Sequence, residues 1–582
     1  MASEEAGRVL TLRDALTVNV LGALVVHQIY KKYEIDPSKL GLTALLLGGV
    51  PSLSTFLLIR LEDQITTGSI ILSILTAFGV YYATLVGAVI FYRLGPFHPL
   101  AGYPGPMLPR VSKVYGLMKM ASGKNHEWHK KMHEKYGPCV RVGPNELSIV
   151  DGDILTSVLG SNGLPKGPMW DARRNPHGVR SLIAIRDMQE HARRRKAWNR
   201  AFSTSSLKGY EPILVRRALQ LTDMLEKQAG AKGGPQKDAV NLVEWMRYFT
   251  FDFMGDMAFG GGFETMRDGT ENVGIWHALE GGVKGLAMMQ HLPWLLELLY
   301  MIPGTTKNVD LLREQSRAAV KRRKQEGSLS KDLFHHLIDE DGMEKEPPTD
   351  AEVISDGVLA ILAGSDTTAT VISGLFYHLL QHAEDYIRLQ GEVDQTFPPG
   401  EGDATDASKL SEMVFLNAVI NEALRINPPA NVLQRSTTAE TGAKQLGKYY
   451  IPEGTAIDFP IYTLFRDPRY FSPAPEEFWP DRWLSTSMRK RAPSSHHSSD
   501  TSLANGDVTM NASAFIPFSY GPANCAGRNL ALAELRMVVA LLIQRFEMRL
   551  EEGYDPKDWT EKLEDWFIMQ TGKLPVVFTA RN

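Results

Sequence analysis

The first hundred residues carry long apolar runs that are separated by short polar breaks. Residues 69–92 are almost wholly apolar or small and are closed by Arg93. A run of roughly 24 residues is long enough to cross a hydrocarbon core of about 30 Å as a helix. We therefore predict a transmembrane helix here. Residues 40–59 and 15–30 are two further candidates, and for both the alternative is a packed or interfacial helix.

Basic residues are spread unevenly around these runs. Lysines follow the first run, and the third is followed by Arg93, Arg110, Lys113 and Lys119. Because positively charged flanks of membrane helices stay in the cytosol, we expect a cytosolic first loop, a cytosolic C-terminal domain and a luminal N-terminus. A removable signal peptide is not expected, since no small-residue cleavage site follows a single short apolar core.

A cluster of prolines separates the apolar runs from the rest of the chain. It comprises Pro96, Pro99, Pro104, Pro106 and Pro109. Because proline lacks the backbone N–H and clashes with the preceding turn, this stretch is predicted to be non-helical and to act as a stiff hinge. The chain then divides into a membrane anchor region with one to three transmembrane helices (1–95), a hinge (96–110) and one large domain (111–582).

In the large domain the pattern favours helices over strands. The longest helical pattern begins at a capping box, Thr349 to Glu352, and continues to about His382, about 45 Å of helix. A helix of this length is expected to cross the whole domain. Residues 136–150 predict two short strands around a Gly-Pro-Asn turn, and residues 163–186, rich in Gly, Pro and Arg, predict a loop. The fold class is mainly α with small β-sheets.

Composition narrows the range of functions. With 43% hydrophobic and 22% charged residues the chain can bury a sizeable core. A net charge of −4 gives no basic surface for nucleic acid. The two cysteines, Cys139 and Cys525, cannot form a disulfide framework or a multi-cysteine metal site. Cys139 lies in a strand-like run, where its expected role is packing.

Several other patterns are interpreted as carrying no chemistry. The glycine run 260–262 lacks the preceding strand of a nucleotide-binding loop. The pairs His335-His336 and His496-His497 are interpreted as incidental, because adjacent residues point to different faces of a helix. Residues 485–511, rich in Ser, His, Asn and Asp, predict a mobile surface insertion.

Cys525 stands between two glycines, where an irregular stretch passes into a helical pattern. At a helix N-terminus the free N–H groups favour the thiolate, which is the ligand that a soft metal prefers. Gly521 permits a turn that a Cβ would block, and Gly527 permits close approach to a flat partner. A lone cysteine is more often a small buried hydrophobe, so the surrounding spacing has to decide.

The spacing Phe518-x-x-Gly521-x-x-x-Cys525-x-Gly527 resembles the haem-binding loop of the cytochrome P-450 family, the haem-thiolate monooxygenases. The resemblance implies the family's triangular-prism fold and heme b (iron protoporphyrin IX) with Cys525 as the axial ligand and Phe518 beside the sulfur. Ala523 is a departure, because the family commonly has Arg or His there to contact a haem propionate. The haem is expected between the long helix and the helix that follows Cys525.

Further family motifs occur in the right order. His191 and Arg195 match residues that reach haem propionates, although a solvated basic face is the alternative. Arg435 matches another propionate contact and is expected to offset Ala523 in part. The family's buried charge network behind the haem corresponds to Glu422, Arg425 and Arg482.

The middle of the long helix carries the family's oxygen-activation motif. There the resemblance implies that Gly364 opens a groove for dioxygen and that Asp366 and Thr367 relay protons. The alternative is that Thr367 only bonds back to the Ala363 carbonyl and bends the helix. Family position also gives a mostly apolar substrate pocket, which comprises Met169, Trp170, Leu182, Ile183, Leu359, Ala363, Val432, Phe567 and Ile568.

The resemblance implies an enzyme that inserts one oxygen atom from O2 into a lipophilic small molecule. Only 57 residues follow Cys525 and no flavin or nicotinamide fingerprint occurs, so a separate NADPH-cytochrome P-450 reductase is expected at the same endoplasmic reticulum membrane. The wording Gly-Pro-Ala-Asn-Cys is similar to fungal members of secondary metabolism, with a terpenoid favoured over an alkaloid. The alternatives are a haem-thiolate isomerase or lyase, which often lacks the Asp366-Thr367 pair, and a non-catalytic haem-binding protein.

Overall fold

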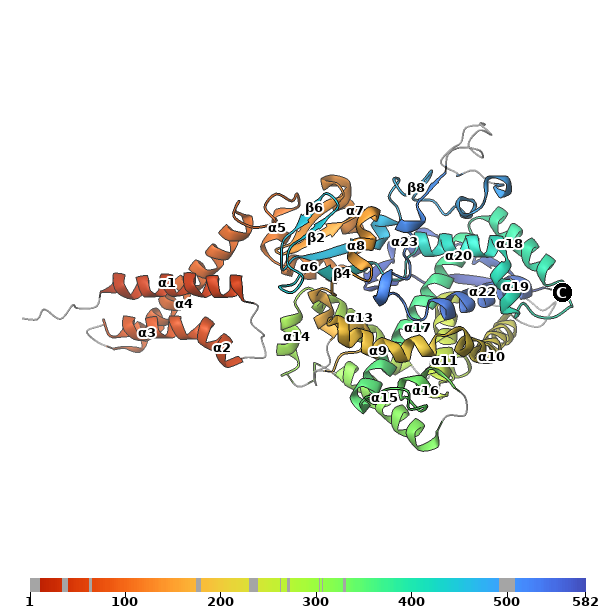
Figure 1. Cartoon of the computed structure of the whole chain (residues 1–582), viewed down its shortest axis with the longest axis horizontal. Coiled ribbons are helices and arrows are strands. Elements are labelled where there is room, and N and C mark those ends of the chain that lie inside the picture. The colour runs from red at the N-terminus through yellow and green to blue at the C-terminus, as the bar shows by residue number, and fades with distance from the viewer. Residues whose placement is uncertain are drawn as a thin grey trace, which may run out of the picture.

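The molecule consists of an N-terminal helical bundle and a larger, mainly helical body with small sheets (Figure 1), and this confirms the predicted fold class. The larger body contains the catalytic domain predicted from the sequence. The structure, a computed structural model, describes residues 11–33, 40–61, 65–173, 179–229, 239–261, 263–269, 273–302, 304–305, 307–327, 331–490, 493 and 508–581.

The N-terminal bundle is built from α1 (Leu12–Lys32), α2 (Leu40–Ala44), a π-helical turn (Leu45–Gly49), α3 (Val50–Ile59) and α4 (Thr67–Leu94). Helices α1 and α3 both pack against α4. Buried Asn19 of α1 donates to the carbonyl oxygen of Ala77 at 2.6 Å, and the hydroxyl of Tyr81 donates to the carbonyl of Leu46 at 2.6 Å. Polar groups inside the bundle are therefore partly satisfied across helices, as an apolar surrounding demands.

Among the described residues three helices are long and apolar enough to cross a membrane: Gly41–Ile59, Thr67–Leu94 and Asp350–Leu379. The third is 61% buried inside the catalytic domain, so its apolar length serves the core. Helix α1 carries charged residues at both ends and packs against α3 and α4. The choice between a span and a packed helix stays open for α1, and α4 corresponds to the predicted transmembrane helix, longer by a few residues.

The prediction that residues 96–110 are entirely non-helical is wrong at its C-terminal end. Helix α5 (Met107–Val111) includes Pro109. A proline is tolerated there because the first helical turn needs no hydrogen bond from its N–H groups. The hinge is also bridged, since Arg93 at the end of α4 donates to the carbonyl oxygen of Val111 at 2.5 Å.

Helix α17 (Asp350–Leu379) is the long helix predicted from the capping box. Thr349 and Glu352 form that box, and the 30 residues of the helix cross the domain. It packs against α11 (Leu242–Phe259), α15 (Lys307–Glu326), α20 (Val414–Ile426) and α22 (Arg528–Arg545). Its core-facing side chains belong to the largest hydrophobic cluster of the molecule, so α17 can position residues deep in the interior.

The main sheet has the strand order β1-β2-β7-β4. Strands β1 (Cys139–Gly143) and β2 (Glu146–Ile149) pair antiparallel, as predicted, and Cys139 is buried. Strand β7 (Ala456–Pro460) runs parallel to β2 and antiparallel to β4 (Val432–Ser436). The sheet thus places β4 at one edge.

Where it is described, the predicted loop 163–186 contains the short 3-10 turns η3 (Pro168–Arg173) and η4 (Leu182–Ala184) and an isolated β-bridge at Lys166. Near the C-terminus β11 (Glu564–Trp566) and β12 (Ile568–Gln570) form a hairpin around Phe567, whose φ is 75°.

The remaining helices include α6 (Val114–Ala121), α7 (Asn125–Tyr136), α8 (Leu155–Leu159), α9 (Met188–Ala201), α10 (Thr204–Ala229), α12 (Thr265–Asp268), α13 (Val273–Met289), α14 (Pro293–Leu299), α16 (Leu333–Leu337), α18 (Ala383–Thr396), α19 (Ala407–Glu412), α21 (Ile461–Leu464) and α23 (Lys557–Glu561). The remaining strands include β3 (Val240–Asn241), β5 (Lys444–Leu446), β6 (Tyr449–Ile451), β8 (Phe471–Ser472), β9 (Thr509–Met510), β10 (Phe546–Leu550) and β13 (Pro575–Ala580).

Some interpretations fall on residues outside the described ranges. These are Gly262, the pair His496-His497 and most of the insertion 485–511. At the far end of that insertion, β9 pairs with β8. The described part of the glycine run ends α11, because Gly260 adopts the left-handed C-cap conformation with a φ of 70°.

Candidate active site

The loop around Cys525 is shaped by its own backbone. The N–H of Cys525 donates to the carbonyl oxygen of Phe518 at 2.9 Å. Gly521 has a φ of 74°, and a Cβ there would lie 2.0 Å from the carbonyl oxygen of Leu159. Glycine is therefore required at this turn. Gly527, at the start of α22, makes only ordinary contacts within the protein, so close approach to a flat partner stays a prediction.

Cys525 is solvent-accessible, and the neighbouring residues from Gly521 to Gly527 are half-buried or exposed. Burial among protein atoms raises the pKa of this thiol, while the N–H of Gly527 and the cations Arg195 and Arg528 lower it. A metal ion bound to the sulfur would lower the pKa of Cys525 further, because a bound cation stabilises the thiolate.

A cluster of basic side chains adjoins the Cys525 loop. It consists of Lys166 in the loop before η3, His191 and Arg195 on α9, and Arg435 on β4. The backbones of Lys166 and Arg435 pair in an isolated β-bridge. Burial, together with the nearby Arg435 and Arg195, lowers the pKa of Lys166 well below its usual value, and burial lowers that of Arg435 to about 10. We call these four residues the basic cluster.

The charges of the basic cluster lack carboxylate partners in the described part of the chain. Lys166 donates to the carbonyl oxygens of Leu182 and Ile183 at 3.0 and 2.7 Å. Arg195 donates to the backbone and side-chain oxygens of Asn524, at 2.6 and 2.9 Å. The guanidinium of Arg435 donates to the neighbouring Gln434 carbonyl at 3.0 Å.

Buried cations are ordinarily paired, because desolvating an unpaired charge is costly. A flat, dianionic ligand such as haem would supply the missing negative charge through its two propionates. The donor set therefore fits the haem that the Cys525 loop implies. Lys166 was missed by the sequence analysis, since only the bridge to Arg435 brings it to this place.

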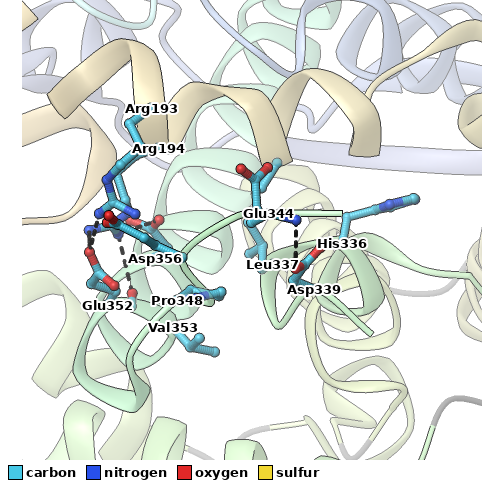
Figure 2. A pocket seen from close by; sticks show the side chains of 12 residues that line it. Arg193, Arg194, His336, Leu337, Asp339, Glu344, Pro348, Glu352, Val353 and Asp356 are labelled. Carbon is cyan, nitrogen blue, oxygen red and sulfur yellow. Dashed lines mark hydrogen bonds and ion pairs between the residues drawn. The ribbon is translucent and has the colours of Figure 1, made fainter. Parts of the chain in front are cut away.

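A second network of ion pairs and hydrogen bonds holds helix α9 against α17 (Figure 2). Arg194 donates to Asp356 at 2.5 Å and to Glu352 at 3.1 Å, and the indole of Trp198 donates to Asp356 at 3.2 Å. Because Asp356 lies on α17, these bonds hold the helix that carries His191 and Arg195 against the long helix. The sequence analysis attached no role to this network.

The oxygen-activation motif lies in the middle of α17. The hydroxyl of Thr367 donates to the carbonyl oxygen of Ala363 at 2.7 Å, as the structural alternative predicted. A Cβ on Gly364 would lie 2.5 Å from the sulfur of Met254 on α11, so close helix packing accounts for this glycine. A dioxygen groove and a proton relay through Asp366 and Thr367 stay predictions. Ala363 is solvent-accessible in mid-helix, which places an open surface beside Thr367.

A buried carboxyl lies next to this motif and was not singled out from the sequence. Glu534 on α22 is 2% exposed and bonds to Thr368 of α17. Its Oε1 has no hydrogen-bond partner among the described residues. Burial raises its pKa well above 4.5, with the bond to Thr368 opposing the shift. The signal was a lone acidic residue inside an apolar helical pattern.

Glu422, Arg425 and Arg482 form a closed network, as predicted. Arg425 binds both carboxylate oxygens of Glu422 at 2.9 and 2.8 Å, and Arg482 binds one at 3.0 Å. The backbone N–H of Trp479 and the indole of Trp483 also donate to Glu422. Although burial alone would raise it, the two arginines hold the pKa of Glu422 at about 2.

The structure brings most of the predicted pocket residues together. Met169, Trp170 and Val432 form a small buried cluster, against which Ile183 and Phe567 pack. Ile568 adjoins it on β12, whereas Leu182 and Leu359 belong to the main core and Ala363 is the open position on α17. The guanidinium of Arg173 lies 3.9 Å from the ring centre of Phe567, so this mostly apolar wall carries one cation.

A cysteine loop beside cations that lack carboxylate partners in the described part of the chain is the arrangement that a haem-thiolate site needs. A family model described as Cytochrome P450 matches residues 104–578. The chain belongs to the cytochrome P450 family and is a monooxygenase enzyme. Membership implies a haem that is held by a cysteine thiolate and the use of O2, a substrate and a redox partner.

The relatives include fungal monooxygenases. Cytochrome P450 monooxygenase FCK2 of Fusarium pseudograminearum is 33% identical over 512 residues, which cover 86% of each chain. Cytochrome P450 monooxygenase phqL of Penicillium fellutanum is 32% identical over 540 residues, 91% of this chain and 86% of the relative. Tryprostatin B 6-hydroxylase of Aspergillus fumigatus is 30% identical over 507 residues, 86% and 84% of the two chains.

Proposed function

We propose that this protein hydroxylates a lipophilic small molecule of fungal secondary metabolism, with Cys525 as the axial ligand of the haem. The observation that carries the assignment is the basic cluster: Arg195 bonds to the Cys525 loop, and the cluster's cations have no carboxylate hydrogen-bond partner within the described ranges. Lys166 and Arg435 would hold the propionates. The side chain of Arg195 is held by Asn524, so this arginine also fixes the loop that presents the sulfur.

Haem bound through a thiolate supplies the activation of dioxygen, because the sulfur donates charge to the iron. The residues of this chain then have to deliver protons and exclude bulk water. Asp366 and Thr367 are the proposed proton donors on α17. The Thr367 hydroxyl donates to the Ala363 carbonyl, and this bond fixes the position of its oxygen. The apolar cluster of Met169, Trp170 and Val432 would keep the substrate side dry.

The proposed location is the endoplasmic reticulum membrane, with the catalytic domain in the cytosol and an NADPH-cytochrome P-450 reductase as electron donor. Large exposed apolar side chains gather on the elements nearest the N-terminal bundle, α5, α6 and α14, with the turn after α14 (Figure 1). They comprise Met107, Leu108, Val114, Met118, Trp294, Met301 and Ile302. Such a patch supports contact with lipid and entry of the substrate from the bilayer.

The substrate class rests on the apolar pocket wall and on the relatives. One relative is named for the 6-hydroxylation of tryprostatin B, and this supports hydroxylation as the reaction. A terpenoid is favoured over an alkaloid here because the pocket cluster is apolar. Feeding both classes to the enzyme with reductase and NADPH, and following products by mass spectrometry, tests the choice; turnover of alkaloids alone would contradict it.

Replacing the cysteine tests the proposed ligand. The reduced wild-type protein under carbon monoxide should show the red-shifted Soret band of a thiolate-ligated haem, and Cys525→Ser should lose it. Cys139→Ser is the matched control and should keep the band, because that thiol is buried in β1. A thiolate band that survives in Cys525→Ser would remove the assignment.

Replacing the alcohol tests the proposed relay. Thr367→Ala should bind haem normally but divert a large share of the NADPH consumed away from product. The control is Thr370→Ala on the same helix, whose hydroxyl donates to the Met569 carbonyl on β12. Turnover without any reductase would instead favour an isomerase or lyase, and unchanged coupling in Thr367→Ala would count against the relay.

A further inference from the structure

A cluster of possible metal ligands lies outside the haem site, at the junction of α16 with the turn before α17. Within the described residues His335, His336 and Asp341 each offer one ligand atom, and these atoms all lie within 4.8 Å of one another. The sequence interpretation had the two histidines pointing apart. Their ring centres lie 5.2 Å apart, in an edge-to-face arrangement within α16.

The protonation of His335 is set by its neighbours. Its Nδ1 lies 2.6 Å from Oε2 of Glu340, and because a carboxylate is an acceptor, that nitrogen carries a proton. In the neutral ring Nε2 then holds the lone pair. Such a carboxylate–histidine pair is the arrangement that orients metal-binding histidines.

The lone-pair nitrogen of His335 faces a second carboxylate. The side chain is 8% exposed, its Nε2 has no well-formed hydrogen bond, and Oδ2 of Asp341 lies 3.0 Å away. At this distance either a proton on Nε2 or a bound cation joins the two groups. The separation is close to the ~3.3 Å that two ligands about 2.0–2.1 Å from a tetrahedral zinc ion would have.

We propose that His335, His336 and Asp341 bind one divalent transition-metal ion of the zinc type, with water completing the coordination. Two imidazoles and a carboxylate suit zinc better than calcium or magnesium, which prefer oxygen ligands. Asp341 is exposed and His336 is half-buried, so both can close on the ion. The ion would join α16 to the turn that precedes α17.

Neighbouring charges define how the site competes with ion pairing. Lys331 is exposed and its ammonium lies 3.0 and 3.1 Å from the two oxygens of Asp341. Arg323 lies 3.8 Å from Glu340, and buried Asp332 accepts the backbone N–H of His335. The competing arrangement is a doubly protonated His335 between Glu340 and Asp341, which would need no metal.

In Figure 2 His336 lies at the end of the pocket opposite Arg194 and Asp356. The proposed ligands share no residue with the α9–α17 network, so the haem spectrum is a separate readout of folding. The test therefore uses the full-length haem-loaded protein without a histidine tag, treated with a chelator and then equilibrated with micromolar Zn²⁺ alone. Elemental analysis gives the ratio of zinc to haem iron, and the carbon monoxide spectrum confirms that each variant is folded.

The expected ratio is close to one in the wild type and close to zero in His336→Gln and Asp341→Asn. His382→Gln, at the N-cap of α18, is the control and should keep the wild-type ratio. Lys331→Met should bind zinc severalfold more tightly, because it frees Asp341 and removes a like charge. A wild-type ratio near zero that Lys331→Met does not raise, or a ratio that survives both ligand substitutions, would overturn the proposal.

Discussion

Two buried charge systems of this molecule differ in one respect. In the network of Glu422, Arg425 and Arg482, both arginines form ion pairs with the carboxylate of Glu422. In the basic cluster, the partners of Lys166 and Arg435 among the described residues are neutral carbonyl oxygens. The first system is complete as folded, whereas the second needs a negatively charged ligand.

The contrast shows how structure and function can be told apart when both use buried arginine. A closed ion network holds segments together, because removing one member leaves the other charges buried and uncompensated, which is costly. An open set of cations is destabilising by itself and makes sense as a binding site. The same substitution should therefore have different consequences in the two places.

The largest effect is expected from opening the closed network. Glu422→Ala leaves Arg425 and Arg482 buried without an anion, which should cost about 3–5 kcal/mol of folding free energy. Chemical denaturation and the yield of haem-loaded protein measure this loss. The control is Glu127→Ala, a surface residue paired with Lys131, which should change stability by about 1 kcal/mol or less.

The same network should lose its stabilising effect only at strongly acidic pH. The folded pKa of Glu422, about 2, lies below the ordinary 4.5, so its contribution to stability is present above pH 4.5 and is lost as the pH falls toward 2. Melting curves between these values should show the loss in the wild type. Equal acid sensitivity in a variant without the ion pairs would contradict the role of the network.

An intermediate effect, in the opposite sense, is expected in the basic cluster. Lys166→Met removes a charge that lacks a carboxylate partner, so the fold should tolerate it, yet haem should be held less firmly. A lost charged hydrogen bond of about 1.5–3 kcal/mol corresponds to haem transfer to apomyoglobin roughly ten- to a hundredfold faster. Lys130→Met, which alters a surface ion pair with Glu476, is the control. Unchanged haem transfer in Lys166→Met would remove this residue from the site.

The smallest effect concerns Glu534, a buried carboxyl with one partner. Since its folded pKa is raised, its contribution to stability is fully present below pH 4.5 and is lost as the pH rises toward the folded pKa. Glu534→Gln keeps the shape without the titration, so it should be more stable than the wild type at neutral pH. The difference should vanish near pH 4, where both side chains are neutral, and thermal melts across pH measure it.

Features encoded by local spacing could be predicted from the sequence. The capping box at Thr349 gives the start of α17, and the glycines around Cys525 give the shape of its loop. The pairing of Glu422 with Arg425 follows from their separation by three residues on one helix. In each case the decisive contacts lie within a turn or two of the chain.

Features that depend on distant segments could not be predicted. Lys166 reaches the basic cluster through a bridge to Arg435, and Gly364 is explained by Met254 on another helix. Pro109 fits a helix because it falls in the first turn, a boundary that the proline count alone could not fix. Such roles depend on tertiary pairing, which local patterns do not record.

The bond from Arg93 to the carbonyl of Val111 spans the proline-rich segment and fastens the two bodies at a second point. Because this bond adds to the covalent linker, it restricts the rotation of the large domain relative to the N-terminal bundle. Any protein that diffuses in the same lipid layer would then meet this one in a nearly constant pose, and its encounter becomes a search in two dimensions.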